Sequence, residues 1–283
     1  MPNLITLCTD FGLKDYAVAS VKGALYSEVP TCNVVDISHD IIPFHREEAA
    51  YIIRNAYCSF PKGTVHIIAV DAAQTPLKKH IVVLLDGHYF ITADNGILSL
   101  ITKTIKPDKI IVIDEQIKTK NRTGSSYPVL DVFVQVAAHI SRGGNIALLG
   151  MEIQELKELT ATEPQLSIDK NELKVPVVYI DNYGNAITSL TRSYFEEVRK
   201  GRKFTIYLPS GLSFTKIVDS YNAINDYSIA DCEAKNVGRE LALFNASDDL
   251  EIAIYKSNKN TVGAASNLLG LKYLDILKIN FFN

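Results

Sequence analysis

Acidic residues stand directly after two apolar, β-branched runs in the first half of the chain. Asp10 closely follows residues 4–8, and Asp71 follows residues 65–70. If both runs are parallel strands, the two carboxylates lie at the carboxyl edge of one sheet, where α/β proteins bind ligands. A carboxylate at that edge can accept two hydroxyl hydrogen bonds, as from a ribose diol. For Asp10 the alternative is the N-cap of a following helix.

Basic side chains follow the same predicted strand ends. Lys78 comes seven residues after Asp71, and a cation in that loop would favour the ionised carboxylate. A solvated pair formed by Lys78 and Lys79 is the alternative. His39 ends a D-I-S-H run and is a candidate for catalysis near neutral pH, or a hydrogen-bonded structural group. The D-N-G run at residues 94–96 is typical of an ordinary turn.

The second half of the chain carries one further candidate, the D-N-Y-G-N run at residues 181–185. A plain turn is one interpretation of this run. In the other, Tyr183 offers a flat face on which a ring can stack, and Asn185 offers the donor and acceptor that an adenine edge requires.

The elements that must position these residues follow from hydrophobic patterning. Continuous β-branched runs bounded by turn residues predict buried strands, and apolar residues at helical spacing predict helices. The predicted strands of the first half are residues 4–8, 33–37, 65–70, 81–85 and 109–113. The predicted helices are residues 17–28, 46–57 and 129–141. Because strands and helices alternate, we expect an α/β domain with a largely parallel sheet.

The second half has a different texture, with short strand-like runs separated by turn residues. The predicted strands are residues 175–180, 204–208, 240–244, 250–254 and 276–282. This pattern predicts a smaller, all-β, barrel-like domain with mostly antiparallel strands. Between the halves the chain is polar and contains a proline, as linkers do. We therefore expect an N-terminal domain over residues 1–165, a linker over 166–173 and a C-terminal domain over 174–283.

Composition excludes several classes of protein. The chain has 283 residues and a net charge of -3, whereas a nucleic-acid-binding protein is expected to carry a basic surplus. No apolar run is long enough to cross a bilayer, so no membrane is expected as a partner. Its four cysteines lack CxxC spacing, which removes support for a zinc site. The beginning of the sequence has no basic leader, and a cytoplasmic location is the expectation.

Taken in order, these motifs resemble one known family. The order is T-D-F-G, K-G, D-I-S-H, F-P-x-G-T-V-H, V-D, D-N-G and D-x-x-G-N-x-x-T, between Ile5 and about Leu271. The chain is identified on them as a divergent member of the S-adenosyl-L-methionine (SAM) hydroxide adenosyltransferases, whose relatives include fluorinases and chlorinases. The resemblance implies an α/β domain, a β-barrel-like domain and a homotrimer. Each SAM would lie between one subunit's N-terminal domain and its neighbour's C-terminal domain.

The resemblance also implies a reaction. Water or hydroxide attacks the ribose C5′ carbon of SAM, and methionine leaves from the sulfonium. SAM is the substrate, and neither a metal nor a separate cofactor is implied. Since the positive sulfur is already a good leaving group, the protein has to position and desolvate the nucleophile.

The residues implied to hold the nucleoside are all present. Asp10 matches the aspartate that binds the ribose diol. Tyr183 and Tyr221 match the aromatic residues that sandwich adenine, and Asn185 matches the asparagine that reads its edge.

The residues implied to hold the methionine end are mostly present. Asp15 and Asp181 match acidic residues there, and Phe44 matches an aromatic wall beside it. The family serine that helps bind the methionine carboxylate is replaced by Ala246. An insertion near residues 256–264 leaves the backbone contacts to adenine from that region undetermined.

The catalytic set implied by the resemblance is only partly kept. Hydroxide-using relatives have an aspartate, an arginine seven residues later and a histidine. Asp71 matches the first, Lys78 stands for the arginine and Pro128 stands for the histidine. Lysine lacks the rigid guanidinium fork, and proline offers no side-chain proton chemistry. Tyr127 is the nearest candidate to replace the histidine. A halogenase is disfavoured because Val129 replaces its serine and an anionic Asp71 repels a halide.

Two main hypotheses follow, with Asp71 and Lys78 as catalytic residues in the first. The chain is an enzyme that hydrolyses SAM to adenosine and L-methionine with a degenerate activating triad. The alternative is a catalytically impaired protein that binds SAM or adenosine. A third possibility is adenosyl transfer to another nucleophile.

Overall fold

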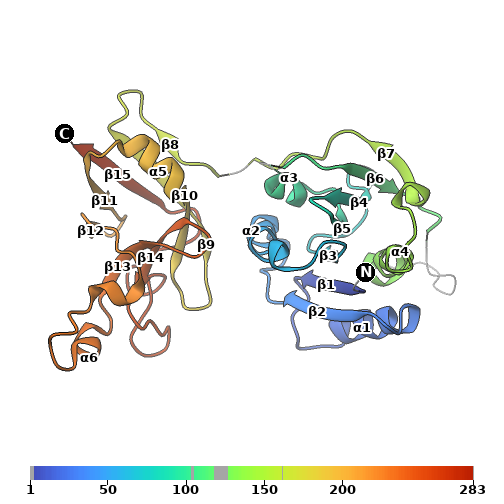
Figure 1. Cartoon of the computed structure of the whole chain (residues 1–283), viewed down its shortest axis with the longest axis horizontal. Helices are drawn as coiled ribbons and strands as arrows, with labels where there is room; N and C mark the ends of the chain where they lie inside the picture. Colours follow the sequence, from blue (N-terminus) through green and yellow to red (C-terminus); the bar gives the residue numbers. More distant parts are fainter. Residues whose placement is uncertain (1–2, 103–104, 118–126, 161, 283) are drawn as a thin grey trace. The chain divides into compact units, whose positions relative to one another are not determined.

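The chain folds into two compact units, Met1–Ala161 and Thr162–Asn283, each with its own sheet (Figure 1). The computed structural model describes residues 3–102, 105–117, 127–160 and 162–282. Each unit is considered by itself below.

The N-terminal unit is built on a seven-stranded sheet in the order β2-β1-β3-β5-β4-β6-β7. Its strands are β1 (Leu4–Thr9), β2 (Asn33–Ser38), β3 (Val65–Ala69), β4 (His80–Leu85), β5 (His88–Ala93), β6 (Lys109–Ile113) and β7 (Gly150–Ile153). The neighbours among β2, β1, β3 and β5 are parallel, and β4, β6 and β7 pair antiparallel. The predicted α/β fold is confirmed, with parallel strands at the core of a mixed sheet.

The reversal of direction comes from a hairpin between β4 and β5 that was not predicted. Its two turn residues, Asp86 and Gly87, have φ values of 50° and 74°. Two successive residues with positive φ form the hairpin turn whose twist matches that of paired strands, and Asp-Gly is a favoured sequence for it. The strand β5 therefore follows β4 directly and inserts between β3 and β4.

Helices cover both faces of this sheet, which is why its central strands β1, β3, β4 and β5 are almost entirely buried. They are α1 (Ala17–Glu28), α2 (Arg46–Ala56), α3 (Ile97–Ile101) and α4 (Val134–Ser141), the last preceded by a π-helical turn, Val129–Phe133. On one face α1 and α4 pack over Leu7, and on the other α2 and α3 pack over Cys8. Successive residues of one strand point to opposite faces, so each face has its own apolar core.

The C-terminal unit is an antiparallel, nearly closed barrel, as predicted. Its sheet order is β12-β11-β15-β9-β10-β14-β13, with β8 paired to β9. The strands are β8 (Gln165–Leu166), β9 (Glu172–Ile180), β10 (Ala186–Thr191), β11 (Lys203–Tyr207), β12 (Ser213–Phe214), β13 (Glu240–Phe244), β14 (Asp249–Ile254) and β15 (Ile276–Phe282).

Two short helices accompany the barrel, α5 (Arg192–Arg199) and α6 (Cys232–Asn236). The hydroxyl of Thr191 accepts a hydrogen bond from the Tyr194 amide and caps α5, as side-chain oxygens do at helix starts. Phe195 of α5 is buried in the barrel core. Neither α5 nor the strand β10 was predicted from the sequence.

Candidate functional site

The strands β1 and β3 end side by side in the N-terminal unit. They are parallel, and Thr9 of β1 pairs with Ala69 of β3. Asp10 and Asp71 therefore follow adjacent strand ends at one edge of the sheet. This is the kind of edge at which open α/β sheets bind ligands.

Asp71 adopts an uncommon backbone conformation at this edge, with φ at 47°. Residues other than glycine rarely adopt this left-handed backbone conformation, and such strain often marks functional positions. The Nζ of Lys78 lies 2.6 Å from the Oδ1 of Asp71 and 3.0 Å from its carbonyl oxygen. The two residues that the sequence placed seven apart thus form a direct ion pair, with 26% of the Asp71 side chain and 14% of the Lys78 side chain exposed.

Asn95 holds the backbone at Asp71 through its side-chain amide. Its Nδ2 donates to the carbonyl oxygens of Val70 and Asp71 at 3.0 and 3.2 Å, and the residue is buried. Arg46 donates in turn to the Asn95 carbonyl at 3.0 Å. The D-N-G run that was predicted to be an ordinary turn therefore holds the backbone of the candidate catalytic aspartate.

Asp10 does not cap a helix, contrary to the alternative left open by the sequence. The N-cap of α1 is Tyr16, and no side chain caps it. The Oδ2 of Asp10 instead accepts a hydrogen bond of 2.9 Å from the backbone amide of Phe44. Phe44 has φ at 66° and an exposed ring. One carboxylate thus links the loops that follow β1 and β2, and it retains lone pairs for further donors.

Tyr127 lies close enough to Asp10 and Asp15 to feel the charges of both carboxylates. Its ring is 5.3 Å from that of Phe11, centroid to centroid. Burial, and then the charges of Asp15, Tyr16 and Asp10, raise the pKa of Tyr127 to about 12. A phenol with that pKa keeps its proton near neutral pH and can donate a hydrogen bond, so it cannot serve as the general base.

The segment after Tyr127 offers no other group for proton transfer at the expected position. Pro128 precedes the π-helical turn, and Val129 inside that turn is buried in the core. Asp15 is exposed in the loop before α1. His39, the other candidate for catalysis, is buried with its ring against Thr9.

In the C-terminal unit, residues 181–185 form the turn between β9 and β10. The backbone amide of Asn185 donates to Asp181 Oδ1 at 2.8 Å, and its Nδ2 donates to Oδ2 at 3.0 Å. The Oδ1 of Asn185 is buried and has no hydrogen-bond partner within the described ranges. Buried acceptors are normally paired, so this atom is available to a donor that the unit itself does not supply.

The turn needs glycine at residue 184. Gly184 has φ at 82°, and a Cβ there would lie 2.6 Å from the Cβ of Ala264 and 2.7 Å from the Oγ of Ser266. Lys259 also reaches the turn, with its Nζ 3.1 Å from the Asp181 carbonyl oxygen. The segment with the expected insertion, residues 256–264, therefore packs directly on the candidate binding turn.

Tyr221 stands beside this turn and leads to a carboxylate that sequence reasoning missed. Its hydroxyl donates to Glu251 Oε1 at 2.5 Å. Burial, then the Glu251 hydrogen bond and charge, and then the charges of Asp181 and Tyr183, raise the pKa of Tyr221. The Tyr221 hydroxyl is therefore close enough to Asp181 and Tyr183 to interact with them electrostatically. Tyr183 itself is exposed at the tip of the turn.

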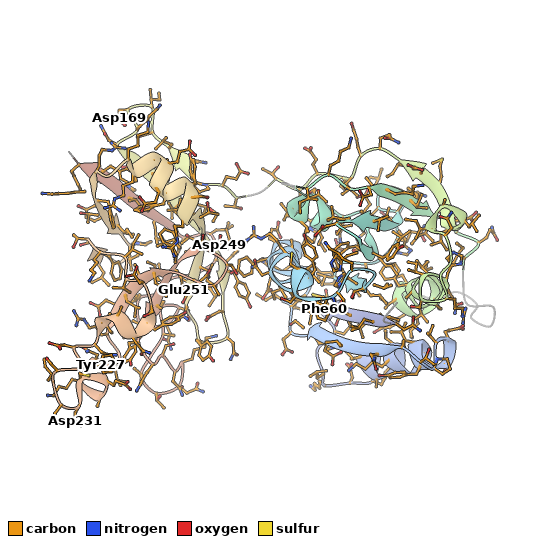
Figure 2. All side chains as sticks on the ribbon, viewed as in Figure 1. Phe60, Asp169, Tyr227, Asp231, Asp249 and Glu251 are labelled. Atoms are coloured by element: carbon orange, nitrogen blue, oxygen red, sulfur yellow. The ribbon has the colours of Figure 1, made fainter. Side chains whose placement is uncertain are left out.

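Glu251 is buried on β14, where Figure 2 labels it near Asp249. Burial raises its pKa most, and the charge of Asp181 adds to this, while hydrogen bonds from Tyr221 and Asn245 lower it. Two acidic residues, Asp249 and Glu251, among the apolar residues of β14 were a signal in the sequence, because charged residues are rarely fully buried unless they are paired.

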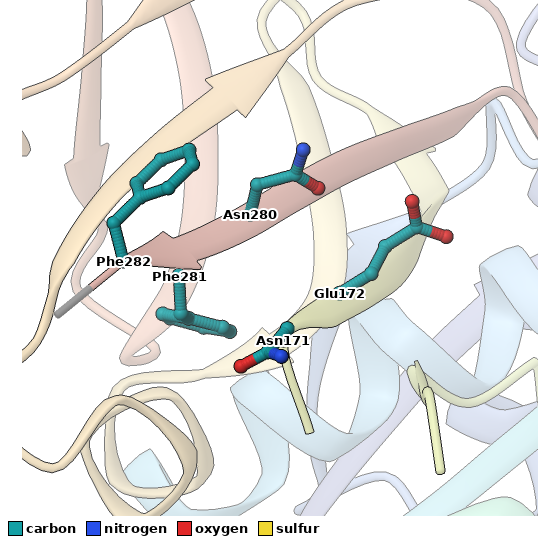
Figure 3. A pocket seen from close by; sticks show the side chains of 5 residues that line it. All are labelled: Asn171, Glu172, Asn280, Phe281 and Phe282. Carbon is teal, nitrogen blue, oxygen red and sulfur yellow. The ribbon is translucent and has the colours of Figure 1, made fainter. Parts of the chain in front are cut away.

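A separate hollow of about 380 Å³ lies at the other end of β9 (Figure 3). It is lined by Asn171, Glu172, Asn280, Phe281 and Phe282. Since β9 spans nine residues, or roughly 25 Å at about 3.3 Å per residue, this hollow is distinct from the turn at 181–185.

The described residues offer neither a metal site nor a membrane-spanning helix. Within the described ranges, no group of three or more His, Cys, Asp or Glu side chains is arranged to hold a metal ion. No helix in those ranges combines the length and the hydrophobicity needed to span a bilayer.

Comparison with known proteins shows where this architecture belongs. Residues 5–150 match the SAM hydroxide adenosyltransferase N-terminal domain, and residues 175–278 match the C-terminal domain of the same family. The chain is 29% identical to an (R)-S-adenosyl-L-methionine hydrolase of Methanocaldococcus jannaschii over 290 residues, covering 98% of this chain and 95% of the relative.

More distant relatives extend the comparison. A fluorinase of Actinopolyspora mzabensis is 23% identical over 223 residues, covering 70% of this chain and 75% of the relative. The crystal structure of an uncharacterized conserved protein from Thermotoga maritima superposes with a TM-score of 0.81 at 23% identity, covering 98% of this chain and 99% of that one. The last likeness concerns the fold. Since both family domains match in order and together cover most of the sequence, the chain belongs to the SAM hydroxide adenosyltransferase family.

Proposed function

We propose that this protein hydrolyses SAM to adenosine and L-methionine. The observation that carries the proposal is the ion pair between Asp71 and Lys78 at the edge where β1 and β3 end. The oxygen of water forms a bond to the ribose C5′ while the C5′–sulfur bond breaks. The electron pair of that bond goes to sulfur, which leaves as the neutral thioether of methionine. The proton lost by water passes to Asp71.

The geometry of the pair suits this role. Lys78 binds Oδ1 of Asp71 and the carbonyl of the same residue, which leaves Oδ2 to accept a hydrogen bond from water. Holding the attacking water in line with the C5′–sulfur bond is worth more than activating it, because the sulfonium is already a good leaving group. The lysine supplies charge without the two-pronged geometry of an arginine.

We assign substrate binding in the N-terminal unit to Asp10, Asp15 and Phe44. Asp10 would receive the ribose hydroxyls on the lone pairs that the Phe44 amide does not use. Asp15, exposed before α1, would face the ammonium group of the methionine end, and the exposed ring of Phe44 would stand beside it.

In the C-terminal unit we assign adenine binding to Tyr183, Tyr221 and Asn185, and the methionine end to Asp181. The two tyrosines offer faces for stacking. The unpaired Oδ1 of Asn185 suits the amino group of adenine as donor. Asp181 orients that side chain through its own hydrogen bond.

We further propose that the working form is a homotrimer in which neighbouring subunits share each ligand. Loops after β1, β2 and β3 carry apolar side chains that are each more than half exposed: Leu13, Tyr16, Ile42, Phe44 and Leu77. Exposed apolar groups gathered around a ligand edge are typical of interfaces. Light scattering should give three times the chain mass, and a monomeric mass would contradict the shared site.

The test of hydrolysis is chromatography of SAM incubated with the purified protein. We expect adenosine and methionine to appear in equal amounts, and Asp71→Asn to slow their formation by about 10²-fold or more. Because the relative from Methanocaldococcus jannaschii is named for the (R) form of SAM, we expect the two sulfonium epimers of SAM to be consumed at different rates. SAM loss no faster than with Asp71→Asn would refute hydrolysis.

A second candidate is a protein that binds SAM or adenosine without turnover. It is favoured by Pro128 at the position of the family histidine, and by Tyr127, whose raised pKa makes it a donor. Calorimetry showing binding of adenosine, together with no product from SAM, would select this candidate. A new adenosyl product in the presence of a panel of anions would instead indicate transfer to another nucleophile.

A further inference from the structure

A chain of polar contacts connects Thr9, the residue before Asp10, to Lys22. None of its members is assigned a contact with the proposed substrate. The ring of His39 is buried, with 3% of its side chain exposed. Its Nδ1 lies 2.8 Å from Thr9 Oγ1, and its Nε2 lies 3.0 Å from Asp36 Oδ1. Lys22 of α1 completes the chain, with its Nζ 2.6 Å from Asp36 Oδ2.

The chemistry of these groups fixes the direction of the hydrogen bonds. An ionised carboxylate only accepts, so a hydrogen bond across the 3.0 Å contact with Asp36 has the Nε2 of His39 as its donor. In the tautomer with its hydrogen on Nε2, the Nδ1 of His39 is an acceptor, and the hydroxyl of Thr9 donates to it. The same Thr9 oxygen accepts the backbone amide of Phe11 at 3.3 Å.

These contacts restrain the backbone on both sides of Asp10. Thr9 precedes it and Phe11 follows it, and one hydroxyl oxygen joins the two. The amide of Gly12 adds a third tie by donating to the His39 carbonyl oxygen at 2.8 Å. The Asp10 carboxylate receives the Phe44 amide at 2.9 Å. Its orientation is therefore determined by the loops after β1 and β2 together.

An irregularity in strand pairing brings His39 to this place. Along the parallel pair, Leu7 is opposite Asp36 but Cys8 is opposite Ser38, so β2 has one extra residue at Ile37. Continuing that register places His39 opposite Thr9. Bulges of this kind re-aim side chains near functional sites.

We propose that His39 is a positioning residue that acts through Thr9 to orient Asp10 for the ribose diol, with the Lys22–Asp36 pair selecting the ring tautomer. This inference rests on the proposed role of Asp10 in SAM binding. It makes the imidazole a determinant of nucleoside recognition without contact to the substrate or to the reacting atoms.

Two substitutions at residue 39 distinguish the roles of the two ring nitrogens. The amide of asparagine overlays Nδ1, so His39→Asn keeps an acceptor for the Thr9 hydroxyl and loses the link to Asp36. The amide of glutamine overlays Nε2, so His39→Gln keeps the link to Asp36 and loses the acceptor. Thr9→Val removes the hydroxyl at nearly constant volume and should behave as His39→Gln does.

The measurement is calorimetry with adenosine and with 2′,3′-dideoxyadenosine, which lacks the diol. We expect His39→Gln and Thr9→Val to weaken adenosine binding about tenfold. This is the effect of losing one hydrogen bond from the ribose diol to the charged Asp10 carboxylate. Dideoxyadenosine binding should stay within about twofold, since its affinity owes nothing to Asp10. His39→Asn should retain most of the adenosine affinity. In turnover assays KM for SAM should rise while kcat is nearly unchanged.

Equal weakening of both nucleosides by His39→Gln would overturn the inference, because it would indicate a general structural role. So would unchanged adenosine binding in both His39→Gln and Thr9→Val. If His39→Gln fails to fold, Thr9→Val alone decides. Asp10→Ala gives the reference value for complete loss of diol recognition. A wild-type protein that binds neither adenosine nor SAM would refute the proposed function itself, which is a different outcome.

Discussion

The Nζ of Lys78 contacts Asp71 twice, at 2.6 Å from Oδ1 and at 3.0 Å from the main-chain carbonyl oxygen. One cation thus neutralises the side chain and stabilises the strained backbone of the same residue, whose φ is 47°. Charge and conformation at this position are therefore coupled. A substitution at Lys78 changes both at once.

Removal of the Lys78 charge is expected to impair turnover as strongly as removal of the Asp71 charge. Lys78→Met should lower kcat for SAM by about 10²-fold, and the double variant with Asp71→Asn should be little worse than either single one, because contacting residues are not additive. Lys78→Arg should remain active.

The matched control is Lys79→Met. Lys79 contacts exposed Glu115 at 3.3 Å, so its loss should leave kcat unchanged. Full activity in Lys78→Met, or strictly additive losses in the double variant, would show that the ion pair has no catalytic role.

Replacement of Asn95 by aspartate is expected to disturb the Asp71 turn while changing the side-chain volume little. Aspartate cannot donate to the carbonyl oxygens of Val70 and Asp71, and it would place a negative charge against them. Asn95→Asp should lower the free energy of unfolding of the N-terminal unit by about 1–3 kcal/mol and kcat by at least about tenfold. Urea titration and SAM turnover measure the two effects.

Asn145→Asp is the control for that substitution. The Oδ1 of Asn145 accepts the Ala147 amide at 2.9 Å, and an aspartate can accept the same bond. Its stability should change by less than about 0.5 kcal/mol. Equal effects of the two substitutions would argue against a special role for Asn95.

Loss of the Tyr221 hydroxyl is expected to leave Glu251 without its nearest donor. Tyr221→Phe keeps the ring for stacking, so adenosine affinity should fall less than in Tyr221→Ala. The free energy of unfolding of the C-terminal unit should fall by about 1–3 kcal/mol, since a buried carboxylate loses a hydrogen bond.

Adding Glu251→Gln should restore part of this loss because a neutral amide is less costly to bury. Tyr227→Phe is the control, since the Tyr227 hydroxyl donates to exposed Glu233 at 3.3 Å. If Tyr221→Phe and Tyr227→Phe are equally stable, the Glu251 contact does not stabilise the unit.

A buried histidine pair predicts how stability depends on pH. His66 Nε2 lies 3.1 Å from His88 Nδ1, and both residues are fully buried. Burial, and then the charge of His88, lower the pKa of His66 to about 3. The unfolded chain binds this proton below its ordinary pKa of about 6.5 while the folded chain does not, so stability is lost as pH falls below that value.

The expected loss for His66 is about 2 kcal/mol between pH 6.5 and pH 5. Urea midpoints of the N-terminal unit at pH 7 and pH 5 measure it. His66→Gln should show a smaller difference between the two pH values than the wild type does. The same difference in both proteins would mean that His66 does not titrate on unfolding.

Much of the candidate site was predictable because it follows local patterns. Apolar runs predicted the strands before Asp10 and Asp71, and parallel strands necessarily end at the same edge. The contact between Asp71 and Lys78 needed only a short loop between them. The turn at residues 181–185 followed from its own glycine and asparagine.

Other parts depended on contacts between residues far apart in the chain. Asn95 had the composition of a turn, and nothing local indicated that its amide reaches back to β3. Glu251 gained its partner Tyr221 from a segment 30 residues away. The hairpin that makes the N-terminal sheet mixed has a local signal in its Asp-Gly turn. The order of the strands in the sheet has none, because it depends on how distant segments pack together.

By itself, then, the sequence determined the two-part fold, the family and the carboxylates at the strand ends. These are encoded by periodicity and by residue type, which act over a few residues. Only the tertiary structure decided which groups orient those carboxylates. The contacts of His39 with Thr9, of Asn95 with Asp71 and of Tyr221 with Glu251 join segments far apart in the chain, and their meeting is set by long-range burial that no local pattern specifies.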